Sequence, residues 1–198
     1  MQIDKARITD SIEVTADYHR FNSDVCGIRG HGVAELWTPR SNLLGGPRGM
    51  ILKQRVEFVN LITQVGDQYY GERAAGIGSP PAQVTGMRLG TGTTAVAKTG
   101  AGAAIVTYVS GSALAIDGGF PTSALSGSSR RIQWKTSWAA GVATASGIAE
   151  AVITNENPLT DVTGTAANTI SRALLSPTVN KGASDTLAIT WNHDLLGA

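Results

Sequence analysis

The sequence has few of the residues that would cross-link a chain or place it in a membrane. Its 198 residues include one cysteine, Cys26, so no disulfide can form within the chain. No stretch approaches the roughly 18 consecutive apolar residues of a membrane-spanning helix. The first ten residues, MQIDKARITD, lack the apolar core of a signal peptide. We therefore expect a protein that stays in a reducing compartment, at least until it is assembled into something larger.

Charge is also scarce and unevenly distributed. Asp, Glu, Lys and Arg make up 16% of the chain, against a usual share of about a quarter. Residues 73–116 contain no acidic residue, and the formal net charge is +1. Such a balance gives no attraction toward nucleic acid. A surface with few solubilising charges suits a protein that is buried against neighbours, so we expect protein partners, and neither nucleic acid nor a membrane.

Glycine, by contrast, is abundant, with 24 residues. In the stretch MRLGTGTTAVAKTGAGAA, two nucleotide-binding patterns overlap: residues 90–95 fit G-x-G-x-x-A, and residues 92–99 differ by one residue from a phosphate-binding loop. Both patterns lack their context, because glycines interrupt the helix that should follow and no acidic residue comes before Asp117. The stretch therefore predicts a glycine-rich loop between strands, with no nucleotide and no other cofactor.

One helix is predicted, at about residues 61–74. Asn60 is a suitable N-cap residue, and the apolar residues that follow fall on one helical face: Leu61, Ile62, Val65, Tyr69 and Tyr70.

Beyond this helix the sequence alternates between strand-like runs and turn signals. The predicted strands are residues 84–89, 104–109, 132–138, 148–154, 170–175 and 187–191, with a further short strand at 55–59 before the helix. Short strands, regular turns and a single helix favour a mainly β fold. We predict an antiparallel β-sandwich over residues 55–198, with the helix packed against it.

The N-terminal region shows no strand or helix period. Residues 1–54 are interpreted as an extended N-terminal arm that anchors the chain to a partner. Because no local element would bury its apolar side chains, they are predicted to form an assembly interface: Phe21, Ile28, Leu36, Trp37, Leu43 and Leu44. The alternative is a monomer whose arm folds back over its own sandwich.

The sequence contains no convincing catalytic or metal-binding constellation. The histidines are isolated, and Cys26 and His31 have no second pair of ligands to complete a zinc site. His193 and Asp194 lack a nucleophile in a recognisable context. The three tryptophans at alternating strand positions, Trp134, Trp138 and Trp191, are typical of core or interface anchors. We therefore expect no enzymatic activity.

Glu150 lies within the apolar run AEAVI, where a buried carboxylate requires a partner. Arg172 or Lys135 could supply it. A structural ion pair is favoured over a general acid.

Several motifs occur in one order. A helix that ends in a glycine-rich turn precedes LGTGTTA, which is followed by RRIQW, GIAEAVI and TISRALLSPTVNKGASDTLAITW. Over about residues 55–192 this order resembles a group of tailed-bacteriophage virion proteins, namely tail-fibre, minor tail and virion structural proteins. In the last stretch the matching residues are Arg172, Ala173, Leu175, Pro177, Lys181, Asp185, Leu187, Ile189 and Trp191.

The resemblance implies an assembly role without chemistry. It implies a tail-side virion protein (a fibre, fibre adaptor or minor tail protein), made in the host bacterial cytoplasm and bound to other virion structural proteins. A homo-oligomer is expected, and a trimer is favoured because fibres and decorations are often threefold. The alternatives are a capsid decoration or cement protein, a carbohydrate-binding β-sandwich that stacks sugars on exposed tryptophans, and a nucleotide-binding enzyme.

Overall fold

The structure is a computed structural model that describes residues 27–40 and 49–196. Within this part of the chain, nine strands form one antiparallel sheet in the order β4-β3-β7-β8-β2-β1-β9-β6-β5. The strands are β1 (Gly27–Pro39), β2 (Met50–Ile62), β3 (Gly86–Gly90), β4 (Leu114–Ala115), β5 (Thr122–Ser126), β6 (Ser129–Trp138), β7 (Ala145–Thr154), β8 (Thr169–Lys181) and β9 (Thr186–Leu196). The helix is α1 (Gln64–Ala75), and two short 3-10 turns are η1 (Gly100–Ala103) and η2 (Ala166–Asn168).

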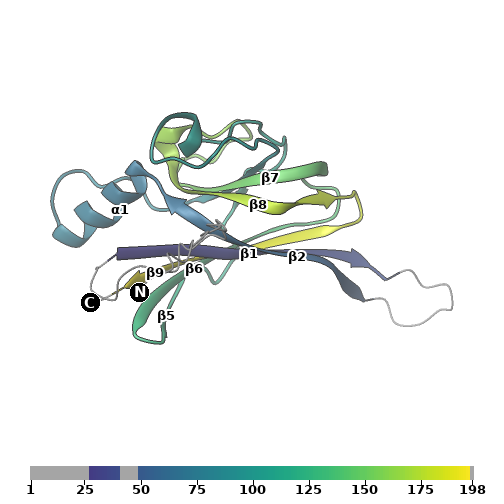
Figure 1. The fold of residues 1–198 in the computed structure, drawn as a ribbon, viewed down its shortest axis with the longest axis horizontal. Coiled ribbons are helices and arrows are strands. Elements are labelled where there is room, and N and C mark those ends of the chain that lie inside the picture. Colours follow the sequence, from purple (N-terminus) through teal and green to yellow (C-terminus); the bar gives the residue numbers. More distant parts are fainter. Residues whose placement is uncertain (1–26, 41–48, 197–198) are drawn as a thin grey trace, which may run out of the picture.

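The sheet curls into a half-barrel, with β7 and β8 on one side and β1, β9 and β6 on the other (Figure 1). Strand β2 belongs to both sides. It pairs with β1 from Met50 to Asn60, and its last residues, Asn60 to Ile62, pair with β8. The predicted mainly β, antiparallel fold with one helix is confirmed. The predicted sandwich is not confirmed, because one continuous sheet forms both sides.

The curl brings the β4 end of the sheet back to β6. The backbone N–H of Asp117, just after β4, donates to the carbonyl oxygen of Lys135 on β6 (2.8 Å). The Asp117 carboxylate accepts hydrogen bonds from the backbone N–H and the hydroxyl of Ser137 (3.1 and 2.7 Å). Since β5 pairs only with residues 129–133 of β6, Asp117 satisfies polar groups at the part of β6 that β5 does not cover.

Apolar side chains from the long strands fill the inside of the curl. Trp134, Trp138 and Trp191 are all buried there, which confirms the prediction that they anchor a core. The indole N–H of Trp138 donates to the carbonyl oxygen of Ser112 (2.8 Å), so its polar group is satisfied. Other members of this core are Leu36, Phe58, Met87, Leu89, Ile148, Ile153, Ile170, Leu175, Leu187 and Ile189.

Strands β1 and β2 show that the prediction for the N-terminal region is wrong over residues 27–39 and 50–54. These residues do not form an extended arm, because β1 lies between β2 and β9 inside the sheet. The buried positions of β1 begin with Gly30 and Gly32. A Cβ at Gly32 would lie 2.4 Å from the Phe58 ring. The buried positions 30 and 32 therefore require glycine. A strand is recognised in a sequence when apolar and polar residues alternate, and these glycines interrupt that alternation. Residues 1–26 and 41–48 of the predicted arm lie outside the described residues.

Two smaller features also differ from the predictions. Residues 104–109 form a loop with one isolated bridge, between Tyr108 and Gly90, and no regular strand. The N-cap of α1 is Thr63 and not Asn60, because β2 continues through Ile62.

The helix predicted at residues 61–74 is confirmed as α1. The Thr63 hydroxyl accepts a hydrogen bond from the backbone N–H of Gly66 (3.1 Å), and Gly76 ends the helix in the left-handed conformation, with φ of 65°. The helix contains two glycines in opposite surroundings. Gly66 is buried against Ile170, whereas a Cβ on Gly71 would meet no atom within 4 Å.

These surroundings predict opposite effects of the same substitution. Gly71→Ala should stabilise the protein by about 0.5–1 kcal/mol, because alanine loses less conformational freedom in a helix than glycine. Gly66→Ala should destabilise it by about 1–3 kcal/mol, because the new methyl would lie 2.2 Å from the Ile170 carbonyl oxygen. Urea unfolding of both variants checks this, and a stabilised Gly66→Ala chain would contradict the described packing of α1.

Candidate functional site

The glycine-rich loop that follows β3 is built around a buried carboxylate. Glu150 of β7 is fully buried and accepts hydrogen bonds from the backbone N–H groups of Gly92 (3.0 Å), Val106 (3.0 Å) and Thr107 (2.9 Å). A Cβ on Gly90 or Gly92 would lie 2.4 or 2.6 Å from Oε1 of Glu150. The glycines of the G-T-G motif therefore let the backbone approach the carboxylate closely.

Arg172 of β8 completes this buried site. Its Nη2 and Nε atoms lie 2.7 and 3.2 Å from Oε2 of Glu150, and neither side chain is exposed to solvent. The remaining nitrogen, Nη1, donates to the carbonyl oxygens of Thr94 (2.8 Å) and Gly102 (3.3 Å). The predicted ion pair between Glu150 and Arg172 is thus confirmed, and it holds both ends of the glycine-rich loop.

This arrangement bears on the two nucleotide-binding patterns. A phosphate-binding loop offers backbone N–H groups to its ligand. Within residues 90–99, however, the N–H of Gly92 binds Glu150, and those of Thr91 and Ala97 donate to the carbonyl oxygens of Thr107 and Gly102 (both 2.8 Å). The chain after Thr99 forms the four-residue turn η1, so the predicted absence of an α-helix at this point is confirmed. The loop is rich in glycine like an anion-binding site, but the anion that it surrounds is the carboxylate of Glu150.

Removing the charge of Glu150 should be strongly destabilising. In Glu150→Gln, the buried Arg172 guanidinium loses its counter-charge, and we expect a loss of about 3–5 kcal/mol. Lys98→Gln is the control, because its ion pair with Asp67 (2.7 Å) is half exposed and should contribute at most about 1 kcal/mol. Urea unfolding at pH 7 measures both, and equal losses would contradict a special role for the buried pair.

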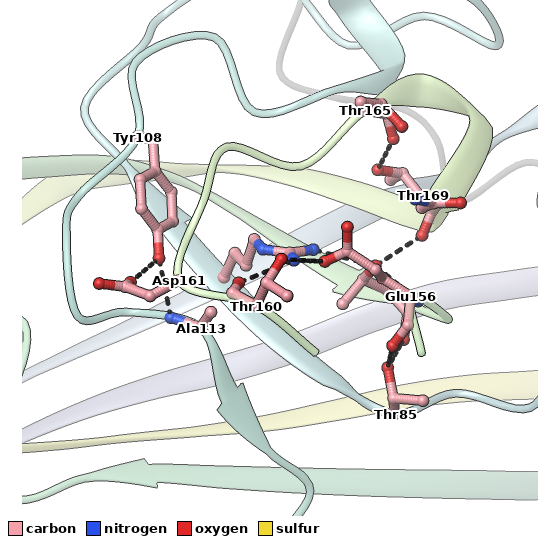
Figure 2. Close-up of polar contacts among 11 residues, drawn as sticks. Thr85, Tyr108, Ala113, Glu156, Thr160, Asp161, Thr165 and Thr169 are labelled. Atoms are coloured by element: carbon pink, nitrogen blue, oxygen red, sulfur yellow. Dashed lines mark hydrogen bonds and ion pairs between the residues drawn. The ribbon is translucent and has the colours of Figure 1, made fainter. Parts of the chain in front are cut away.

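Figure 2 shows a second polar network, on the segment between β7 and β8. Arg88 of β3 is fully buried, and burial lowers the pKa of its guanidinium. It forms an ion pair with Glu156 and donates to the hydroxyl of Thr154 (3.2 Å) and the carbonyl oxygen of Thr160 (3.1 Å). The sequence analysis missed this pair, since Arg88 and Glu156 are 68 positions apart in the chain.

A neighbouring contact ties the same segment to the loop that precedes β4. The Asp161 carboxylate accepts hydrogen bonds from the Tyr108 hydroxyl and from the backbone N–H of Gly111 (2.7 Å), and the Tyr108 bond contributes most to lowering the Asp161 pKa (Figure 2). The Tyr108 oxygen in turn accepts from the backbone N–H of Ala113 (3.2 Å). The carboxylates of Glu156 and Asp161 thus bind donors of the protein itself. These contacts hold the segment between β7 and β8 against β3 and against the loop that precedes β4.

His193 is the most perturbed histidine. It is fully buried, its Nδ1 lies 2.6 Å from the Tyr70 hydroxyl, and its Nε2 accepts a hydrogen bond from the Trp191 indole N–H (3.1 Å). Since Trp191 can only donate, a proton on Nε2 would face another N–H. Burial is the main cause that lowers the pKa of His193 to about 3. The imidazole therefore stays neutral and joins α1 to the sheet through Tyr70.

Protonation of His193 should destabilise the fold in acid. An unfolded histidine takes up a proton near pH 6.5, while the folded ring does not until about pH 3. Stability should therefore fall as the pH falls below about 6.5, by up to about 1.4 kcal/mol per pH unit. His31 adds a smaller effect of the same sign, because its pKa is also lowered by burial.

In His193→Gln, the slope of unfolding free energy against pH should be clearly smaller between pH 6 and 4.5. Urea unfolding at several pH values measures this slope. A variant with the wild-type slope would show that His193 is not the group responsible. The carboxyl of Asp194, whose pKa Arg131 lowers, contributes only at lower pH.

The structure separates the residues that could have formed a catalytic or metal site. His193 is buried, whereas Asp194 on the opposite face of β9 accepts hydrogen bonds from Arg131 (2.7 and 2.9 Å). No group of three or more His, Cys, Asp or Glu residues in the described part of the chain is placed to hold a metal ion. Cys26 and His19 lie outside the described residues. None of the helices described is long and apolar enough to cross a membrane.

The predicted assembly residues fall into three groups. Leu36 is 1% exposed and belongs to the core, so it is not available to a partner in this fold. Ile28 and Trp37 are half-buried on β1. Phe21, Leu43 and Leu44 lie outside the described residues.

The described surface instead offers an apolar patch that the sequence analysis did not single out. Met50, Ile51 and Leu52 are 45, 46 and 45% exposed. They pair with residues 37–39 of β1, and we call these six residues the hairpin end. Consecutive strand residues point to opposite faces, so both faces of the hairpin end lie outside the core. Figure 1 shows this end projecting past the other strands. Its signal in the sequence was the run Met50-Ile51-Leu52, which follows a glycine and was assigned to the arm.

Comparisons of the chain with protein-family models, with curated proteins and with solved structures yield no match.

Proposed function

We propose that the chain is a non-enzymatic structural component of a bacteriophage virion, on the tail side, and that it acts through protein–protein assembly. The observation that carries the proposal is the hairpin end, where three consecutive large apolar residues are nearly half exposed. Exposed apolar side chains that cluster in one place are typical of interaction sites. The order of motifs over residues 55–192, which resembles tail-fibre and minor tail proteins, supports a virion as the assembly.

The internal chemistry of the fold also supports a structural role. Two fully buried arginines are paired with carboxylates: Arg172 with Glu150 and Arg88 with Glu156. Each pair fastens loops to the sheet. An assembly protein needs loops that keep one shape against a neighbour, and paired buried charges provide this rigidity.

Two alternatives lose support from the same observations. Stacking of sugar rings needs exposed aromatic faces, and Trp134, Trp138 and Trp191 are 2, 0 and 0% exposed. Nucleotide binding at residues 90–99 would need backbone N–H groups there, and those of Thr91, Gly92 and Ala97 already bind acceptors of the chain itself. A capsid decoration or cement protein remains the second candidate, because the exposed hairpin end suits a capsid surface equally well.

The proposal predicts that the hairpin end is required for incorporation into the particle. Ile51→Lys places a charge on an exposed position, so the fold should be retained while burial against a partner becomes unfavourable. Mass spectrometry of virions that carry Ile51→Lys should show at least a tenfold lower copy number than wild type. Leu125→Lys, at a 72% exposed position on β5, is the control and should be incorporated normally.

The same preparations test the function itself. Wild-type protein should be found in purified virions at a fixed copy number, and immunogold labelling should place it on the tail. Labelling of the head would favour the decoration protein, and absence from virions would refute both.

A further inference from the structure

An apolar cavity lies where strands β1 and β2 separate. Pairing between the two strands stops at Gly30 and Asn60, because the last residues of β2 pair with β8. The cavity has a volume of about 700 Å³, and its wall begins with Gly27, the first described residue of the chain. Its apolar lining comes mainly from Ile28, Val59, Leu61, Ile62 and Val96.

Helix α1 and the glycine-rich loop complete the wall of the cavity. Tyr70 and Gly71 of α1 line it, together with Asp67 and Lys98, which are half exposed and form an ion pair with each other (2.7 Å). The hydroxyl of Tyr70 lies 2.6 Å from Nδ1 of His193, so this group also has a partner inside the chain. Such a wall suits an apolar occupant without a charge.

The sequence that leads into the cavity wall contains a segment of matching chemistry. Residues 1–26, which precede Gly27, lie outside the described part of the structure. The N-terminal region as a whole has no regular period, but residues 12–18, IEVTADY, alternate between apolar and polar side chains. In an extended strand, successive side chains point to opposite faces, so this run would have one apolar face. That face consists of Ile12, Val14, Ala16 and Tyr18.

From these features we infer that residues 12–18 occupy the cavity of their own chain as an extended strand, with the apolar face of the run against the apolar lining. The same alternation directs Glu13 and Asp17 away from the cavity, so no charge is buried in it. The contact lies within one chain, so this inference does not depend on the proposed function.

The distance along the chain favours this occupant over a segment of another molecule. Tyr18 precedes Gly27 by nine positions, and an extended chain of that length reaches up to about 30 Å. Since Gly27 itself lines the cavity, the segment has only to reverse its direction to lie there. Asn22, Ser23 and Asp24, between the run and β1, are residue types that favour turns.

Two matched variants of the full-length chain test which face of the run is buried. Val14 and Thr15 are adjacent and both β-branched, but only Val14 belongs to the apolar face. Val14→Asp should displace the segment, because a carboxylate is unfavourable in an apolar cavity. Thr15→Asp introduces the same carboxylate on the opposite face and should leave the segment in place.

Hydrogen exchange followed by mass spectrometry measures whether residues 12–18 are shielded. In wild-type protein and in Thr15→Asp, their backbone N–H groups should exchange at least about a hundredfold more slowly than in a free peptide of the same sequence. In Val14→Asp the exchange should come within about tenfold of the peptide. Protection of β9 in each variant shows that the sheet remains folded.

A substitution in the cavity wall tests the location of the segment. A Cβ on Gly71 meets no atom within 4 Å, and tryptophan suits a helix better than glycine does. Gly71→Trp should therefore compete with the segment for the cavity and remove the protection of residues 12–18. Gly118→Trp is the control, because its Cβ also meets no atom but lies between β4 and β5. Gly71→Leu replaces Gly71→Trp if β9 loses its protection.

Three kinds of result would overturn the inference. Residues 12–18 that exchange in the wild type as fast as the free peptide would leave the cavity to another occupant. Equal protection in Val14→Asp and Thr15→Asp, or full protection in the folded variant at Gly71, would place the segment elsewhere. Protection that disappears on dilution would show that the segment comes from a neighbouring copy.

Discussion

The ion pair between Glu150 and Arg172 fixes the glycine-rich loop to one side of the curled sheet. It joins neighbouring strands, β7 and β8, at a point where neither side chain is exposed to solvent. Two buried charges cost free energy unless each finds further hydrogen-bond partners. Here the glycine-rich loop supplies them, with N–H groups for Glu150 and carbonyl oxygens for Arg172. The loop has no regular secondary structure over most of its length, so the ion pair takes the place of a strand or helix in fixing its course.

The same pair explains why the loop resembles a nucleotide-binding motif. Any loop that wraps closely around an anion needs glycines and backbone N–H groups that point inward, whether the anion is a phosphate or a carboxylate. Gly90 and Gly92 are needed because Oε1 of Glu150 occupies the space of their missing side chains. The sequence alone argued against a phosphate as the anion, because the glycines after Lys98 and Thr99 interrupt the helix that a nucleotide-binding motif requires.

The parts of the fold that the sequence predicted are those with a clear local signal. Strand β6 alternates between apolar and polar residues, strand β7 is a nearly continuous apolar run, and α1 ends at the expected glycine, Gly76. Glu150 could be recognised as buried because its neighbours are apolar. Strand β1 could not be recognised, since Gly30 and Gly32 occupy the inward positions that face Asn60 and Phe58. The pair of Arg88 and Glu156 depends on contacts between distant parts of the chain, for which a single sequence has no signal. The pairing of β2 with β8, which joins the two sides into one sheet, is also a contact between distant parts of the chain. The sequence therefore predicted two separate sheets.

The position of β1 has a consequence for how the chain folds during synthesis. This strand, the first in the described part of the chain, is hydrogen-bonded along its length to β9, the last strand described. Its edge on that side stays open until β9, which begins at Thr186, has also been translated. Such a high contact order slows folding, and an open edge can pair with the wrong strand in the meantime. The glycines that open β1 weaken its preference for the extended form, which makes premature pairing less favourable until Phe58 and Trp191 are there to pack against it.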